Sequence, residues 1–201
     1  MARRGHGNGA DNLRINWVAI VLAIVSIIQG LALARLAETM DGLHQAAQWS
    51  AFTLAFFVVV RVFQTYVAAA VDYSDWTPNL LDLVLIFGVG LVQFQLISGL
   101  QDAPFHGDRT ERWTCVIGAL GLIGHASAYA RIRVRPQQKW EAERRLQLIN
   151  MAGSAVVALT AIPILAVMVS EAWLVALPLV QALAIAVNVH LSLASSMAHR
   201  N

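Results

Sequence analysis

The sequence predicts an all-α integral membrane protein, a polytopic bundle of six transmembrane helices. Of 201 residues, 58% are hydrophobic and 13% are charged, whereas soluble domains have roughly 45–50% apolar and roughly 25% charged residues. The hydrophobic residues gather in runs, each close to the roughly 20 residues with which a helix crosses a bilayer. Lys and Arg are concentrated in a few of the segments that separate these runs. These observations together favour a membrane bundle over a soluble domain.

The predicted spans are bounded by charged residues, proline and tryptophan. They lie near 16–37, 50–71, 79–100, 113–131, 147–169 and 172–196. A polar, basic segment (1–15) precedes them and a short tail (197–201) follows. The six Trp residues all lie at or just outside these boundaries, where the headgroup region suits an indole ring. Thr77 and Pro78 predict an N-cap and first helical position for the third span.

The distribution of Lys and Arg predicts the orientation, because short basic loops stay in the cytoplasm. Most of the 14 basic residues fall on one side of the predicted bundle. They are Arg3, Arg4, Arg14, Arg131, Arg133, Arg135, Lys139, Arg144, Arg145 and Arg200. Both termini and the loop 132–146 are therefore expected in the cytoplasm, and the protein in a bacterial-type cytoplasmic (inner) membrane. A cleaved signal peptide ending near Ala34 is the alternative, but the first run exceeds the usual 7–15 residues or so.

Composition and motifs exclude several classes of function. A net charge of +2 is too small to indicate nucleic-acid binding. The single cysteine, Cys115, excludes an internal disulfide and a cysteine-built metal site. The sequence contains no phosphate-binding loop and no H-E-x-x-H zinc motif. An enzyme is therefore less favoured than a protein that conducts, carries or docks.

Ionisable residues inside a predicted span are functional candidates, because a charge near the bilayer centre costs about 2.5–3.5 kcal/mol or more. Arg61 lies midway along the second span, on the same helical face as Asp72 and beside Gln64. Asp82 begins the third span, in line with Gln93 further along. We expect Arg61 to reach Asp82 or Asp72, as a buried ion pair or as part of an ion or proton path.

Two histidines allow a haem hypothesis. His125 and His190 are each about six residues from the cytoplasmic end of a predicted span, so both could ligate one b-type haem. His125 is also a candidate for the ion or proton path. Outside this set, Arg35 and Glu38 are spaced to pair on one helix, with Gln29 deeper.

The last three spans carry features that bear on packing and motion. Pro163 and Pro178 each free a carbonyl four residues earlier, at Leu159 and Leu174, which predicts possible hinges. Each of these spans also has one stripe of small or polar residues, which predicts close helix contacts. The stripes include Thr114, Gly118, Gly121 and His125; Asn150, Gly153 and Ser154; and Gln181, Asn188 and Ser192.

The leading functional hypothesis is a small channel or ion or small-solute transport protein that acts as a homo-oligomer. The alternative is a non-conducting membrane subunit that docks a cytoplasmic protein, or anionic lipid, through its basic loop. The docking residues would be Arg131, Arg133, Arg135, Lys139, Arg144 and Arg145. A haem protein is the third hypothesis, and otherwise no cofactor or metal is expected.

Overall fold

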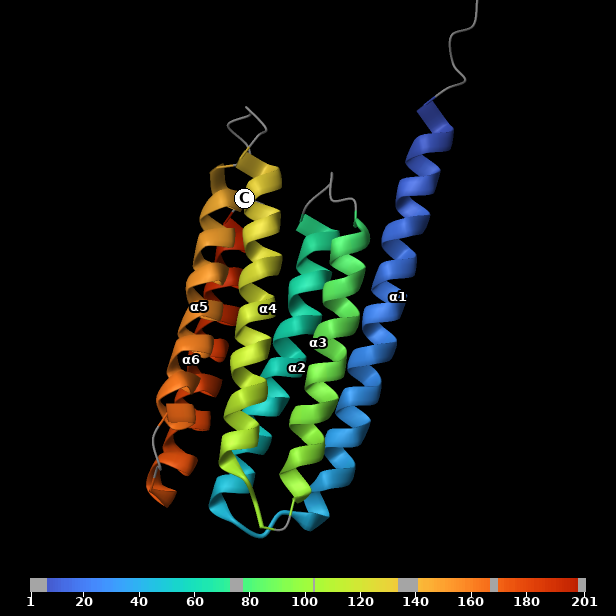
Figure 1. Ribbon diagram of the computed structural model, residues 1–201. Coiled ribbons are helices and arrows are strands. Elements are labelled where there is room, and N and C mark those ends of the chain that lie inside the picture. The colour runs from blue at the N-terminus through green and yellow to red at the C-terminus, as the bar shows by residue number, and fades with distance from the viewer. Residues whose placement is uncertain (1–6, 73–77, 103, 134–140, 167–169, 199–201) are drawn as a thin grey trace, which may run out of the picture.

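Figure 1 shows the computed structural model of the chain, which describes residues 7–72, 78–102, 104–133, 141–166 and 170–198. This described part contains six α-helices, two short 3₁₀ turns and no strand, so the predicted all-α class is confirmed. The helices are α1 (Gly7–Thr39), α2 (Ala46–Asp72), α3 (Leu80–Ser98), α4 (Gly107–Arg133), α5 (Glu141–Ala166) and α6 (Glu171–Ala198). Each contains most of one predicted span.

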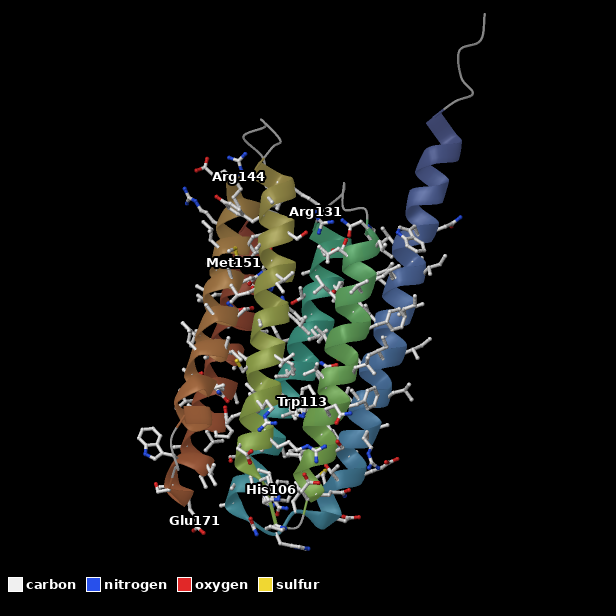
Figure 2. The ribbon with its side chains drawn as sticks, in the orientation of Figure 1. His106, Trp113, Arg131, Arg144, Met151 and Glu171 are labelled. Atoms are coloured by element: carbon white, nitrogen blue, oxygen red, sulfur yellow. The ribbon has the colours of Figure 1, made fainter. Side chains whose placement is uncertain are left out.

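The helices run alternately up and down along one common direction (Figure 1). Figure 2 shows Arg131 and Arg144 at one end of the bundle, where α1 begins and α6 finishes, and we call this the basic end. His106 and Glu171 lie at the other end, the opposite end (Figure 2). Alternating directions are typical of bundles in which short loops join consecutive helices.

Five described helices contain stretches long and apolar enough to cross a membrane. These stretches are Asn16–Gly42, Ala46–Ala70, Leu80–Gln101, Gly107–Ile132 and Glu171–Ala194. The predicted fifth span, 147–169, extends beyond α5 into residues outside the described part. The surface exposes large hydrophobic side chains, unlike that of a soluble bundle. Leu80 is 76% exposed and Leu91 69%, whereas the polar Glu111 and Gln181 are each 1% exposed. An apolar exterior, with charged and amide side chains buried between the helices, is the arrangement that a bilayer favours.

Five of the helices form a closed ring. α2 packs on α6, α6 on α5, α5 on α4, α4 on α3, and α3 on α2 again. α1 lies outside this ring and packs on α2 and α3, at one edge of the bundle in Figure 1. The Trp17 Nε1 donates a hydrogen bond of 2.8 Å to the Pro78 carbonyl, which ties α1 to the start of α3.

Glycine lets α4 and α5 approach closely. A Cβ atom at Gly118 would lie 2.7 Å from the backbone nitrogen of Ala158, and one at Gly121 would lie 2.7 Å from Ser154 Oγ. Small residues at such positions allow two helix backbones to touch. The predicted stripes of Gly118 and Ser154 therefore do form a close helix contact.

The start of α3 differs from the expectation. Its N-cap is Asn79, not Thr77, which lies outside the described residues. The Asn79 side chain accepts a hydrogen bond from the Asp82 backbone, and the Asp82 carboxylate accepts one of 2.9 Å from the Asn79 backbone. This reciprocal capping box outweighs the proline signal, because it satisfies two backbone donors at once.

Pro178 lies inside α6, as expected. The Leu174 carbonyl that it frees accepts a hydrogen bond of 3.3 Å from Ser50 Oγ of α2, which shares its proton with the Ala47 carbonyl at 2.8 Å. A neighbouring helix thus satisfies the carbonyl, which is one of the ways in which membrane helices tolerate proline. Its role as a hinge stays a prediction, and so does that of Pro163, whose side chain lies outside the described residues.

Candidate functional site

The ring of α2 to α6 encloses a cavity of about 270 Å³. Its lining comes from all five helices of the ring and includes no residue of α1. The polar lining residues are Arg61, Gln64, Thr65, Tyr66, Asp82, His125, Arg131, Glu143, Gln147, Asn150, Ser154, Asn188 and Ser192. The cavity reaches from Arg131 and Glu143, near the basic end, to the middle of the bundle. A space of this kind with convergent polar groups is the usual form of a small-molecule site.

Arg61 lies in this cavity and is held by oxygen atoms from three helices. Its Nη2 donates a hydrogen bond of 2.6 Å to Asn150 Oδ1 of α5, and its Nη1 donates one of 3.5 Å to Ser192 Oγ of α6. Gln64, one turn along α2, accepts a further hydrogen bond. Ser192 Oγ donates in turn to Asn150 Oδ1 at 3.0 Å. This network fixes the guanidinium about halfway along α2, because each partner is itself held on a helix.

Asp82 has a different ion-pair partner from the one expected. Arg131 of α4 donates two hydrogen bonds of 3.0 Å, one to each carboxylate oxygen. The expected contact between Arg61 and Asp82 is therefore replaced by this bidentate pair. Arg61 lies eleven residues, about 16 Å, from the end of α2, whereas Asp82 lies in the first turn of α3, close to the last turn of α4.

His125 is the third expected site residue in the cavity, where its Nδ1 lies 2.9 Å from Gln147 Oε1 of α5. His190 is exposed on α6 and is not among the residues that line the cavity. The structure therefore does not bring the two imidazoles together. In the described part of the chain, no cluster of three or more His, Cys, Asp or Glu residues is placed to hold a metal ion.

Gln93 was expected in the ion or proton path, on the helix face of Asp82 and further along the third span, but its side chain points elsewhere. Its Nε2 donates a hydrogen bond of 3.1 Å to Gln29 Oε1 of α1, and both side chains are buried. The pair joins α1 to α3 outside the cavity, because Gln93 points to α1 and not into the ring. The expected pair of Arg35 and Glu38 is confirmed, at 2.9 Å.

The basic residues expected to dock a partner differ in how exposed and how engaged they are. Arg131 is engaged inside the bundle, whereas Arg145 is exposed and pairs with Glu141 at 3.4 Å. Arg144 lies at the basic end (Figure 2). The side chains of Asp72 and Arg133, and all of Arg135 and Lys139, lie outside the described residues. A docking role for this loop stays a prediction.

The charges along the cavity are not evenly distributed. Its two acidic lining residues are Asp82 and Glu143, both in the first turn of a helix that starts at the basic end. Deeper in the cavity, Arg61 is the lining residue that carries a full charge, among amide, hydroxyl and imidazole groups. The inner part of the cavity therefore presents a positive charge and hydrogen-bonding groups.

An apolar floor separates the cavity from the opposite end. Val58 of α2, Ile117 of α4, Val157 of α5 and Ile185 of α6 line its deepest part and belong to the hydrophobic core. All four side chains are buried. Their contacts close the interior of the bundle on that side.

Arg131 and Glu111 are charged residues engaged inside the bundle that the sequence did not place in the ion or proton path. Arg131 was assigned to the basic loop, because its neighbours in sequence are basic. Glu111 was assigned to the connection before the fourth span, yet α4 starts at Gly107 and Glu111 is 1% exposed. The predicted fourth span, 113–131, has Arg131 as its last residue and leaves Glu111 outside, because charged side chains at its two ends indicate span boundaries and not inward-facing residues of the helix.

The chain matches no family model, no curated protein and no solved structure. Its function is therefore inferred from the cavity and the side chains that line it.

Proposed function

We propose that the protein is an integral membrane transport protein that carries or conducts small anionic solutes through the cavity around Arg61. The observation that carries the proposal is a polar cavity enclosed by apolar helices, with a guanidinium in its deep part. Ionisable groups inside a membrane are rare, and they mark substrate and ion pathways. In this proposal all six helices span the bilayer, and the basic end faces the cytoplasm.

The charge distribution favours an anion over a cation. A solute that enters from the basic end passes Asp82, whose charge is compensated by Arg131 at 3.0 Å, and then meets Arg61. Guanidinium groups bind carboxylate and phosphate oxygens through parallel hydrogen bonds. The neighbouring Asn150 and Ser192 supply the polar groups that would exchange with such a solute.

The size of the cavity favours a small solute. Its volume of about 270 Å³ lies just below the range of roughly 300–1,000 Å³ found for drug-sized ligands. One chain encloses this space, so the proposal needs no ring of subunits to form a pathway. The homo-oligomer expected from the sequence stays a prediction.

The apolar floor supports a carrier or a gated conductor over an open pore. Val58, Ile117, Val157 and Ile185 close the route to the opposite end. Passage to that end therefore requires the helices of the ring to separate at this level, as in alternating access.

The test is anion entry into liposomes that contain the purified protein. Potassium salts of chloride, nitrate, phosphate and succinate are added with valinomycin, so that light scattering reports anion entry. We expect the wild type to accelerate the entry of at least one salt, and Arg61→Gln to reduce that rate at least about tenfold, because the guanidinium contact is lost.

Arg35→Gln is the matched control, because it removes an exposed arginine of α1 outside the cavity. It should leave the rate unchanged. No anion entry in the wild type, or equal rates for Arg61→Gln and the wild type, would contradict the proposal. Circular dichroism of each variant checks that the bundle has folded.

A further inference from the structure

Glu111 forms a second polar cluster, separate from the cavity. Gln181 Nε2 of α6 donates a hydrogen bond of 2.9 Å to Glu111 Oε2, and also contacts Thr160 Oγ1 of α5 at 3.3 Å. Glu111 and Gln181 are each 1% exposed. Neither residue lines the cavity. The cluster joins α4, α5 and α6 toward the opposite end.

The cluster has more acceptors than donors. Glu111 Oε1 and Gln181 Oε1 are both fully buried and have no hydrogen-bond partner among the described residues. A buried oxygen without a donor is unfavourable by about 1–3 kcal/mol, and more if it carries charge. These two oxygens, on a hydrogen-bonded pair of side chains, are able to accept a donor or a cation that the described side chains do not supply.

No described cation neutralises Glu111. On its own helix, Arg112 pairs with Asp108 at 3.6 Å, and Arg109 pairs with Asp102 at 2.6 Å. The remaining titratable group nearby on α4 is Cys115. The facing stretches of the other ring helices contain no titratable residue at all. They are 46–60 of α2, 83–98 of α3, 146–166 of α5 and 172–189 of α6.

We propose that Glu111, Gln181 and Thr160 form a binding site for a monovalent cation, a proton or Na⁺. An uncompensated carboxylate is strongly disfavoured in a low-dielectric interior, so binding of such a cation stabilises the folded bundle. A proton would join one carboxylate oxygen, whereas Na⁺ would take carboxylate, amide and hydroxyl oxygens together. Carboxyl groups and carbonyl oxygens serve these two ions in many transport proteins.

The site is placed to couple the cation to the anion, a role that rests on the proposed function. Thr160 is three residues beyond Val157 of the apolar floor, and Gln181 is four residues before Ile185. The cluster is therefore about one helical turn beyond the floor. Along α5, Asn150 and Thr160 are separated by about 15 Å. At that distance, neutralising Glu111 would strengthen anion binding at Arg61 on the order of fivefold, and the effect is reciprocal.

The binding itself is tested without any transport measurement. Purified full-length protein in lipid nanodiscs is studied by infrared difference spectroscopy over a pH titration and by equilibrium binding of radioactive sodium. We expect either a protonated-carboxyl band or saturable sodium binding in the wild type, and its loss in the nearly isosteric Glu111→Gln. A band identifies the proton, and sodium binding identifies Na⁺.

Glu38→Gln is the control, because it removes an exposed carboxylate that pairs with Arg35. It should change neither signal. Gln181→Ala, which keeps the carboxyl group, should weaken Na⁺ binding about tenfold by removing the amide oxygen. It should not weaken proton binding, because the lost Nε2 donor favours the ionised carboxylate. If wild type and Glu111→Gln show the same band and the same sodium binding, the cation site is wrong.

Coupling is then tested in the liposome assay. Anion entry by the wild type should change with the pH gradient or the sodium gradient, and entry by Glu111→Gln should not respond to either. An infrared or sodium signal together with normal flux in Arg61→Gln would leave the cation site standing and overturn the proposed function. Reduced flux in Arg61→Gln, without an infrared or sodium signal that depends on Glu111, would overturn the cation site and leave the proposed function standing.

Discussion

Arg61 and Glu111 are two charged groups that lie deep between the described helices, and the bundle accommodates them in different ways. Arg61 lies in a cavity of about 270 Å³, where Asn150 and Ser192 supply neutral oxygen atoms. Glu111 lies in a packed region with no cavity lining, and one of its oxygens has no donor among the described residues. A charge inside a membrane needs either polar space or a bound counter-charge. This difference supports the proposed solute site in the first region and the proposed cation site in the second.

The cavity region should depend strongly on the Asp82–Arg131 pair. Asp82→Asn should lower the free energy of unfolding by about 2 kcal/mol, less than the roughly 3–5 kcal/mol of a fully buried pair, because the Arg131 side chain is 34% exposed. Unfolding in mixed micelles measures this change. Glu38→Gln, which breaks an exposed pair on α1, should cost less than about 0.5 kcal/mol. Equal effects of the two variants would contradict the structural role of Asp82.

The two regions should respond differently to added volume. Ala161→Leu, next to Thr160 and at 0% exposure, should destabilise the bundle by about 2 kcal/mol through overpacking. Ala184→Leu projects into the cavity, so it should leave stability within about 0.5 kcal/mol but slow anion entry several-fold. Thermal unfolding and the liposome assay separate the two effects. If both variants destabilise equally, the cavity does not have the free space described.

The stability of α6 near Pro178 should depend on a hydroxyl of α2. Ser50→Ala removes the donor to the Leu174 carbonyl and should lower stability by about 1 kcal/mol. Ser26→Ala is the control, because Ser26 is exposed and its hydroxyl donates to the Leu22 carbonyl of its own helix. No difference between the variants would show that the freed carbonyl finds another donor.

The Gln29–Gln93 pair should have the smallest effect, because it lies outside both regions. Replacing both residues by leucine should leave the free energy of unfolding nearly unchanged, since neither polar group remains without its partner. Anion entry should also be unchanged. A large loss of flux in the double variant would show that the solute pathway depends on Gln29 or Gln93, as predicted for Gln93 from the sequence.

The sequence predicted the helices well and the partners of the charged residues poorly. Hydrophobic runs near 50–71 and 79–100 identify α2 and α3, because length and composition determine where a helix can cross. Arg61 and Asp82 were recognised as interior residues for the same reason. Their partners, Asn150 and Arg131, depend on the order of the helices in the ring and on depth along each helix. Neither can be obtained from hydropathy.

Glu111 shows why the second region was missed. A span is usually assigned from uninterrupted apolar residues, so a charged first turn is placed in a loop. The four residues from Arg109 to Arg112 carry three charges, yet Glu111 turns inward toward Gln181 while Arg112 stays exposed. Only the helix packing distinguishes these neighbours. A buried carboxylate among outward-facing charges leaves little trace in the sequence.

Thiol accessibility at position 184, inside the proposed anion pathway, distinguishes an open cavity from a packed interior. Ala184→Cys is introduced after Cys115→Ala, and membrane vesicles of either orientation are treated with a charged, impermeant thiol reagent. The cavity account predicts labelling from the basic side only, slowed by an anion that the wild type transports and unaffected by that anion in Arg61→Gln. Position 161, treated in the same way, should remain unlabelled. Labelling at 184 that is as slow as at 161, or that no transported anion slows, would contradict the account.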